Sequence, residues 1–369
     1  MYYIVMGIVF FVLLLGLYWL TGRIFTLFGV IQIGKWKVRV IRILLSILLC
    51  IICLLWDAGG LVAVHLIVLY ALMDLIAIVI RRVCKKKNSK IYLILKKSYH
   101  LCMLPILVTG LLLAYGSYNI NQIQRTEYKV TSGKLKNDYK IIFISDTHYG
   151  TVQKPDIIKE KIREIKKLEP DLMILGGDIV EEGTTKEEMR EVFRLFSGIK
   201  PRYGIYYIYG NHDRQMYAPH PSYTDKELEN SLKENGITAL KDDCISLGTD
   251  LLIAGREDIS RGRESRADTE KILKGNLENR YVILADHQPV QIEENVRQGV
   301  DLQLSGHTHA GQFFPIGYMN TLFGTYNYGM FEIEESQAIV SSGMGGWGFP
   351  FRTQGICEYV EVCLFREHK

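Results

Sequence analysis

The chain has 369 residues, of which 48% are hydrophobic and 23% are charged, and this composition excludes a disordered or collagen-like chain. Its net charge of +4 is unevenly distributed: residues 1–125 contain 14 Lys and Arg against two acids, and the remainder contains 30 against 38. Two physically different parts are therefore joined, and the acidic balance of the second part argues against a nucleic-acid groove there.

Four long apolar runs lie within residues 1–118. Residues 2–20, 43–56 and 101–118 carry no charge, and residues 60–80 hold a single acid. Each run approaches or reaches the roughly 17–25 residues that cross a bilayer as a helix. The pattern predicts a transmembrane domain of four spanning helices. The first run is not typical of a cleaved signal peptide, because it lacks a basic start and a small-residue cleavage site.

The charges between these runs predict the orientation of the chain in the membrane. Five Lys and Arg lie in residues 21–42 and eight in residues 81–97, whereas residues 57–59 have none. Loops rich in Lys and Arg remain cytoplasmic. We therefore expect a multi-pass plasma-membrane protein whose N-terminus faces outward. A polar linker at residues 119–138 and the large domain that follows it are then also extracytoplasmic.

Two polar residues interrupt the third apolar run. His65 and Asp74 are nine residues apart, which places them on opposite faces of a helix, so they do not form a pair. We expect Asp74 to pack toward the interior of the helix bundle or near its inner interface.

From residue 139 onward, short apolar strands alternate with amphipathic helices. Residues 140–145 and 171–175 predict strands, and residues 155–168 predict a helix with isoleucines at helical spacing. Further strands are expected at 204–209, 244–247, 251–254, 281–285, 302–305, 338–342 and 359–364, and further helices at 186–196, 226–234, 267–273 and 290–298. This alternation predicts a layered α/β domain with mixed sheets over residues 139–369.

Polar residues follow several of these strands directly, and ligands of α/β sheets gather at the carboxyl ends of strands. Five of the nine histidines lie at such ends. The candidate metal ligands are Asp146, His148, Asp178, Asn211, His287, His307 and His309. This set of carboxylate, imidazole and amide groups contains no thiolate and suits Mn, Fe or Zn. Because seven ligands are too many for one ion with an open position, we expect two ions that share one carboxylate.

Five blocks containing these residues resemble the motifs of the calcineurin-like metallophosphoesterases, in the same order. The blocks are Asp146-Thr147-His148, Gly177-Asp178, Gly210-Asn211-His212-Asp213, a lone His287, and Gly306-His307-Thr308-His309. The resemblance covers roughly residues 139–365. The segment 340–352 further resembles the membrane-anchored bacterial branch, which includes phosphodiesterases and pyrophosphatases of lipid precursors.

The resemblance implies a role for each candidate residue. Asp146, His148, Asp178 and His309 would hold the first ion, and Asn211, His287 and His307 the second, with Asp178 shared between them. A hydroxide bridging the two ions would attack phosphorus. His212 would face the leaving-group oxygen or a phosphate oxygen. The acid that orients His212 is left open between Glu181 and Asp213.

The substrate is less defined by the sequence. Arg352 is the favoured side chain for gripping a phosphate, followed by Arg214 and Arg202, because Arg binds phosphate bidentately. Trp347, Phe349 and Phe351 are candidates for an apolar lip or for anchors at a bilayer interface. We expect a phosphorylated, amphiphilic substrate such as a lipid headgroup or a lipid-linked pyrophosphate. Cys244, Cys357 and Cys363 allow one disulfide, which the sequence does not assign.

An alternative hypothesis is a membrane signalling or transport protein whose C-terminal domain only binds a ligand. Asp74 within an apolar run motivates it. The complete ligand set favours the enzyme, since we expect a non-catalytic relative to lack one or more ligands.

Overall fold

The computed structural model of the protein describes residues 2–27, 35–55, 59–83, 103–262, 265–273 and 279–367. The chain forms two compact units, Met1–Ala114 and Tyr115–Lys369. Six of the 13 basic residues that predict the orientation, all within 85–97, lie outside the described residues.

The described part of the first unit is helical. It contains α1 (Tyr2–Leu27), α2 (Lys35–Leu55), α3 (Gly59–Val83) and most of α5 (Met103–Asn119), which match the four predicted runs as helices. Among the described residues, α3 alone is both long and apolar enough to cross a membrane, and the apolar stretches of α1 and α5 are shorter. The helices are confirmed, whereas four membrane spans are not.

The acid of α3 has a partner within the first unit. Asp74 forms an ion pair with Arg23 of α1. The Nδ1 atom of the buried His65 lies 2.8 Å from the backbone oxygen of Leu61, one helical turn earlier. Asp74 and His65 thus have separate partners, as their spacing predicts.

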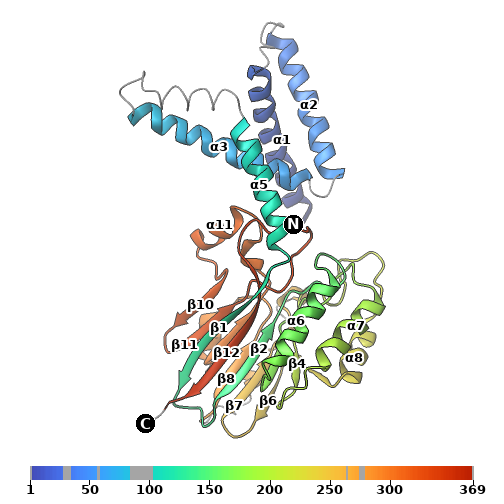
Figure 1. The fold of residues 1–369 in the computed structure, drawn as a ribbon, viewed down its shortest axis with the longest axis vertical. Coiled ribbons are helices and arrows are strands. Elements are labelled where there is room, and N and C mark those ends of the chain that lie inside the picture. The colour runs from blue at the N-terminus through green and yellow to red at the C-terminus, as the bar shows by residue number, and fades with distance from the viewer. Residues whose placement is uncertain are drawn as a thin grey trace. The chain divides into compact units, whose positions relative to one another are not determined.

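The second unit contains two six-stranded mixed sheets, as the alternation of strands and helices predicts (Figure 1). The first sheet has the order β1 (Ile123–Ser132), β12 (Cys357–Arg366), β2 (Tyr139–Ile144), β3 (Leu172–Leu175), β4 (Ile205–Tyr207) and β5 (Ile237–Ala239). The second has the order β10 (Gly329–Ile333), β11 (Ser336–Val340), β9 (Leu302–Ser305), β8 (Tyr281–Ala285), β7 (Leu251–Gly255) and β6 (Asp243–Leu247). The strands β2 to β5 are parallel to one another, as are β7, β8, β9 and β11.

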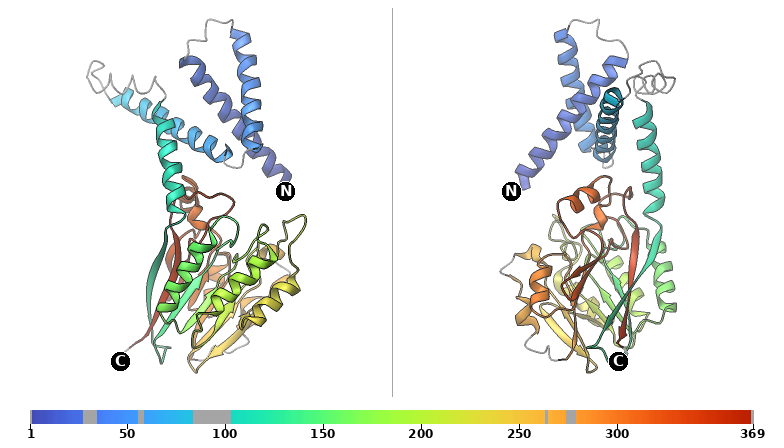
Figure 2. Two further views of the ribbon diagram at one scale, coloured as in Figure 1. Left: turned by 45° about the vertical axis from the view of Figure 1, so that its right-hand side comes forward. Right: turned by 90° about the vertical axis from the view of Figure 1, so that its left-hand side faces the viewer.

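The two sheets stack face to face, with helices on their outer faces (Figures 1 and 2). The helices of this unit are α6 (Pro155–Lys167), α7 (Lys186–Ser197), α8 (Asp225–Glu234), α9 (Thr269–Leu273), α10 (Ile292–Arg297) and α11 (Ile316–Leu322). Successive residues of β2 point to opposite faces. Ile142 therefore packs in the core that contains residues of α6, α7 and α8, whereas Phe143 packs between the sheets. On the outer face of the second sheet, Leu284 packs with Ile272 of α9.

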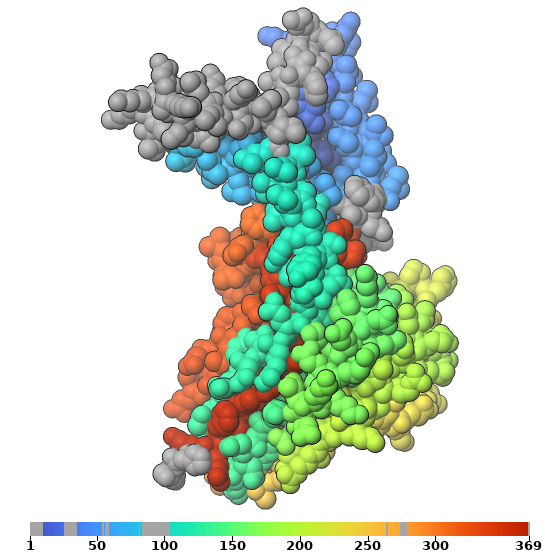
Figure 3. All heavy atoms as spheres, in the orientation of Figure 1, coloured from blue at the N-terminus to red at the C-terminus, as the bar shows by residue number. Residues whose placement is uncertain are grey.

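The polar segment 119–138 is not a linker, so that prediction was wrong. Residues 123–132 form β1, which pairs in parallel with β12 along its full length (Figure 3). β1 is an edge strand with mostly exposed or half-buried side chains, and such a strand lacks the apolar run by which a buried strand is found. The sequence also failed to predict β5, β10 and α11.

Candidate metal centre

The carboxyl ends of strands from both sheets carry the predicted ligands. β2 leads into Asp146 and His148, and β3 leads into Asp178. Asn211 and His212 follow β4. From the second sheet, β8 leads into His287, and β9 leads into His307 and His309. Stacking of the two sheets brings these ends together, which explains how residues more than 100 positions apart meet.

The structure gathers six of these side chains into two groups. Within each group, the potential ligand atoms lie within 4.8 Å of one another. One group is Asp146, His148 and His309, and the other is Asp178, His287 and His307. The Nε2 atoms of His148 and His309 are 3.3 Å apart. The Nε2 atom of His287 is 3.1 Å from a carboxylate oxygen of Asp178.

An unpaired buried atom fits a bound cation at this place. Among the described residues, the buried Asn211 Oδ1 has no hydrogen-bond partner. Leaving such atoms unpaired costs about 1–3 kcal/mol each, so buried polar groups of this kind call for a partner such as an ion. The imidazole, amide and carboxylate groups are those that Mn, Fe and Zn accept. The residues present therefore fit a pair of divalent cations.

The backbone at the site adopts conformations that L-residues rarely take. Asp146, His148, Asp178, His307 and His309 all have positive φ angles, between 43° and 69°. Each such residue costs on the order of 1–3 kcal/mol and persists only where its surroundings hold it in place. Strained residues of this kind cluster at functional sites.

Two glycines allow these turns to approach one another. A Cβ atom on Gly210 would lie 2.2 Å from a carboxylate oxygen of Asp178, and one on Gly306 would lie 2.3 Å from a carboxylate oxygen of Asp146. Any larger residue at either position would displace a candidate ligand.

The acid beside His212 is Glu182, and neither predicted candidate contacts this ring. Glu182 Oε2 lies 2.6 Å from His212 Nδ1, whereas Glu181 Oε2 lies 2.9 Å from His148 Nδ1. Burial disfavours the charged ring of His212, but the hydrogen bond to Glu182 and the charges of Asp178 and Glu182 outweigh it and raise the pKa of His212 to about 9. Glu182 thus favours the protonated ring of His212 and occupies its Nδ1 atom.

Asp213 has a different role from the one predicted. Its buried carboxylate accepts hydrogen bonds from the backbone N–H groups of Gly210 at 2.6 Å and of Asp178 and Ile179 at 2.9 Å each. It therefore ties the turn after β3 to the turn after β4. Asp213 positions the backbone of Asp178 and does not orient His212.

The two favoured arginines are not available to a phosphate, which corrects the expected substrate contacts. Arg352 is fully buried, and its guanidinium donates to the backbone oxygens of His309, Ser342 and Gly345 at 2.7–3.0 Å. Arg214 makes a bidentate ion pair with the buried Glu257, with N···O distances of 2.7 and 2.8 Å.

Arg202 is exposed, but it lies at the opposite end of β4 from the candidate ligand Asn211. It precedes the amino end of β4 and lies over the ring of Tyr203, whereas Asn211 follows the carboxyl end. None of the three arginines therefore has the place that the sequence suggested.

Two exposed aromatic rings lie beside His212. The ring of Trp347 is 6.2 Å from that of His212, as expected of a lip residue, and the ring of Tyr217 is 5.4 Å away. Sequence reasoning missed Tyr217 and Glu182. Tyr217 lies five residues after His212, and this spacing does not predict a contact between the two side chains. Glu182 is next to Glu181 in the sequence, and only the conformation of the loop decides which of the two side chains faces His212.

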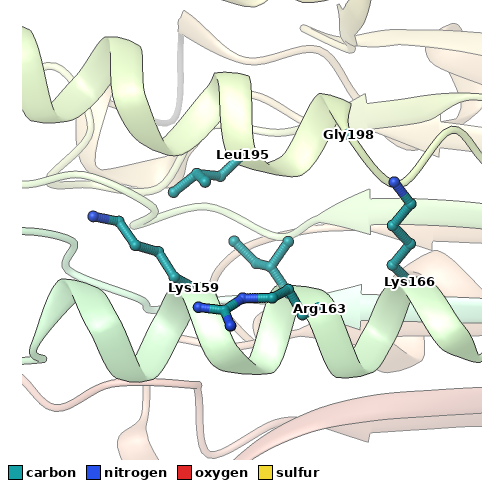
Figure 4. A pocket seen from close by; sticks show the side chains of 6 residues that line it. Lys159, Arg163, Lys166, Leu195 and Gly198 are labelled. Carbon is teal, nitrogen blue, oxygen red and sulfur yellow. The ribbon is translucent and has the colours of Figure 1, made fainter.

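A surface pocket between α6 and α7 does not contain the candidate ligands (Figure 4). Its lining includes Lys159, Arg163 and Lys166 of α6 and Leu195 of α7. The two groups of candidate ligands lie at the strand ends, outside this pocket. Among the described residues, Cys244, Cys357 and Cys363 form no disulfide with one another.

Stacked mixed sheets with carboxylates and imidazoles at their strand ends define a two-sheet α/β domain with a candidate dinuclear metal centre. Residues 139–311 match the family of calcineurin-like phosphoesterases. This part of the chain is therefore a calcineurin-like metallophosphoesterase domain.

Several relatives are named as metallophosphoesterases or as proteins with a metallophosphoesterase domain. An uncharacterized metallophosphoesterase of Helicobacter pylori is 34% identical over 222 residues, which are 59% of this chain and 58% of that protein. A Danio rerio protein named as a transmembrane protein with a metallophosphoesterase domain is 26% identical over 72% of this chain and 63% of its own length. An uncharacterized metallophosphoesterase of Aquifex aeolicus is 29% identical over 66% of this chain and 93% of its own length. The chain thus spans less than two thirds of the Helicobacter and Danio relatives.

Proposed function

We propose that the protein is a membrane-anchored, dinuclear metal-dependent phosphohydrolase that cleaves a phosphoester or pyrophosphate bond. The observation that carries this proposal is the convergence of two groups of candidate ligands at the strand ends of two stacked sheets. The family match of residues 139–311 supports the same chemistry.

The first ion would be held by Asp146, His148 and His309, and the second by Asn211, His287 and His307. Asp178, which the structure places with the second group, would be the shared carboxylate. When bound, two divalent cations such as Mn, Fe or Zn lower the pKa of water and offset the charge that develops on phosphoryl oxygens.

The protein's own residues would supply proton transfer and positioning. His212 has Nδ1 on Glu182, which leaves Nε2 as the atom that can donate a proton to the leaving-group oxygen. The backbone N–H of His212 donates to Asp178 at 2.9 Å, which fixes the backbone of His212 with respect to this carboxylate. Asp213 would maintain this arrangement by holding the backbone of Asp178.

Anchoring through the N-terminal helices is part of the proposal, with four spans, an extracytoplasmic catalytic domain and a domain boundary near residue 118. The apolar length of α3 and the name of the Danio relative support it. The signalling or transport alternative was based on Asp74 as an acid within an apolar run. Because Asp74 is paired with Arg23 in the first unit, this residue no longer supports that alternative. We propose an amphiphilic phosphoester as the substrate class, in keeping with the exposed Trp347 beside His212.

The test uses the full chain, purified and loaded with Mn²⁺, on an aryl phosphate and a bis-aryl phosphate. We expect Asp178→Asn to lower the rate at least about a hundredfold and to reduce the bound metal from near two equivalents, since it removes the shared carboxylate. Asp156→Asn, on the exposed start of α6, is the matched control and should leave both quantities unchanged. Full activity in Asp178→Asn would contradict the proposal.

A further inference from the structure

The second unit has an exposed apolar surface that the proposed reaction does not use. α11 presents Tyr318 and Leu322, which are 66% and 82% exposed, and Phe323 beyond its end is 77% exposed. Ile316 and Met319 are also exposed. We name this surface, consisting of the exposed side chains of residues 316–323, the α11 patch.

The chain around the α11 patch contains no charged residue. From Ala310 to Phe331, and again from Ser336 to Phe351, there is no Asp, Glu, Lys, Arg or His. A surface that faces water normally mixes charges of both signs among its apolar side chains. The exposed or half-buried parts of these segments, mainly residues 313–330 and 347–351, are rich in Phe, Tyr and Trp and have the composition of a surface at the membrane–water interface.

The patch is firmly attached to the candidate metal centre. Gln312, three residues after the candidate ligand His309, accepts from the backbone N–H of Trp347 at 2.8 Å and donates to its backbone oxygen at 3.0 Å. The rings of Phe313 and Phe349 pack edge to face, 5.9 Å apart. These contacts join the segment that leads into α11 to the loop of Trp347, whose ring lies 6.2 Å from that of His212.

The patch is also tied, within the same compact unit, to the end of an apolar helix. The backbone N–H of Gly317 in α11 donates to Gln354 at 3.1 Å. The neighbouring Gly355 accepts from Asn119 at 2.8 Å, and Arg352 donates from its backbone to Gly116 at 3.0 Å. Gly116 and Asn119 form the last turn of α5, whose residues Leu104–Asn119 are apolar. The last turn of α5 and the start of α11 thus contact the same short segment, residues 352–355.

We propose that the α11 patch inserts into the interfacial layer of a lipid bilayer and holds the candidate metal centre beside the headgroups. This inference rests on the membrane anchoring proposed above and specifies which face of the catalytic domain meets the lipid. The partner is the bilayer surface itself, contacted through apolar and aromatic side chains rather than through charge. Phosphoesters in lipid headgroups would then reach His212 past Trp347 without leaving the membrane surface.

The test is photolabelling of the full chain in phosphatidylcholine vesicles that contain a phospholipid with a diazirine on its acyl chain. After illumination, mass spectrometry locates the adducts. We expect adducts on residues 316–323 and on α3, and none on α7. Adducts on residues 316–323 without adducts on α3 would support the patch and contradict the proposed span alone. Absence of adducts from residues 316–323 would overturn the inference. The patch would then be covered by a second copy of the chain or by the helical unit instead of by lipid.

A double variant makes the test quantitative. Leu322→Glu with Phe323→Glu should lower adduct yield on residues 316–331 about tenfold, because charged side chains are expelled from the interface. Asn230→Glu with Thr238→Glu adds the same charge at exposed positions of α8 and β5 and should leave the yield unchanged. Both variants should hydrolyse a water-soluble aryl phosphate as the wild-type chain does, which shows that they fold. Equal adduct yields in the two variants would overturn the inference.

Discussion

Glu181 and Glu182 are adjacent in the chain but contact different histidines of the candidate site. Glu181 accepts from His148, a candidate ligand, and Glu182 accepts from His212, the candidate proton donor. A carboxylate behind a metal-binding imidazole fixes the ring and raises its basicity, whereas one behind a proton donor fixes the atom that faces the substrate. The two acids are therefore expected to affect different steps.

Substituting each acid by its amide separates these roles. We expect Glu181→Gln to weaken metal binding by about 10–100-fold, with activity restored by excess Mn²⁺. Glu182→Gln should keep its metal but lose at least about tenfold in kcat, which excess Mn²⁺ does not restore. Metal titration and steady-state kinetics on the two variants make the comparison. The same response to Mn²⁺ in both variants would contradict this division.

At the scale of single elements, α7 and α8 begin in the same way. Thr185 and Thr224 each cap their helix, and each is paired with a glutamate three residues later in a capping box. Glu227 of the second box also forms an ion pair with Lys186, the first residue of α7. This contact and the hydrogen bonds from Thr224 lower the pKa of Glu227 from 4.5 to about 2.

The lowered pKa of Glu227 predicts how its contribution to stability depends on pH. A carboxyl whose pKa is lower in the folded state stabilises the fold above its ordinary pKa, and this contribution is lost as the pH falls toward the folded value. We expect Glu227→Gln to lower the urea midpoint at pH 7, and the difference from the wild-type chain to shrink between about pH 4.5 and pH 2. Glu229→Gln on the same helix is the control and should have a smaller effect, because it removes only an exposed ion pair with Lys241. A difference that does not change with pH would contradict the assignment.

Most elements of the second unit could be predicted from the sequence because they are buried. β3 and β8 are continuous apolar runs, and α6 repeats isoleucines at helical spacing. β1 could not be predicted, because it is polar and its partner β12 lies more than 200 residues later in the chain. α11 could not be predicted either, since its apolar residues face outward and show no buried stripe.

The candidate ligands could also be predicted, because strand ends place them without reference to side-chain packing. The arginines could not. Whether Arg352 faces a substrate or the interior depends on three backbone carbonyls, one at His309 and two in the loop that contains Ser342 and Gly345. Only the folded chain shows that these oxygens surround it.

At the scale of the whole molecule, the proposed orientation is open to a direct test. Lys241 is half exposed, and Arg82 is exposed near the end of α3, next to the basic residues predicted to be cytoplasmic. A membrane-impermeant maleimide should label the Lys241→Cys variant in intact cells more strongly than it labels the wild-type chain, which gives the background. It should label Arg82→Cys only after the membrane is permeabilised. The opposite pattern would place the catalytic domain in the cytoplasm.

β12 lies between β1 and β2 in the first sheet, although it is the last strand to be synthesised. During translation, β1 and β2 emerge early and have no neighbour between them until β12, more than 200 residues later, leaves the ribosome. The sheet that carries Asp146 and Asp178 is therefore closed only when β12 is in place. A premature stop upstream of Cys357 leaves an open gap in this sheet rather than a shorter but intact domain.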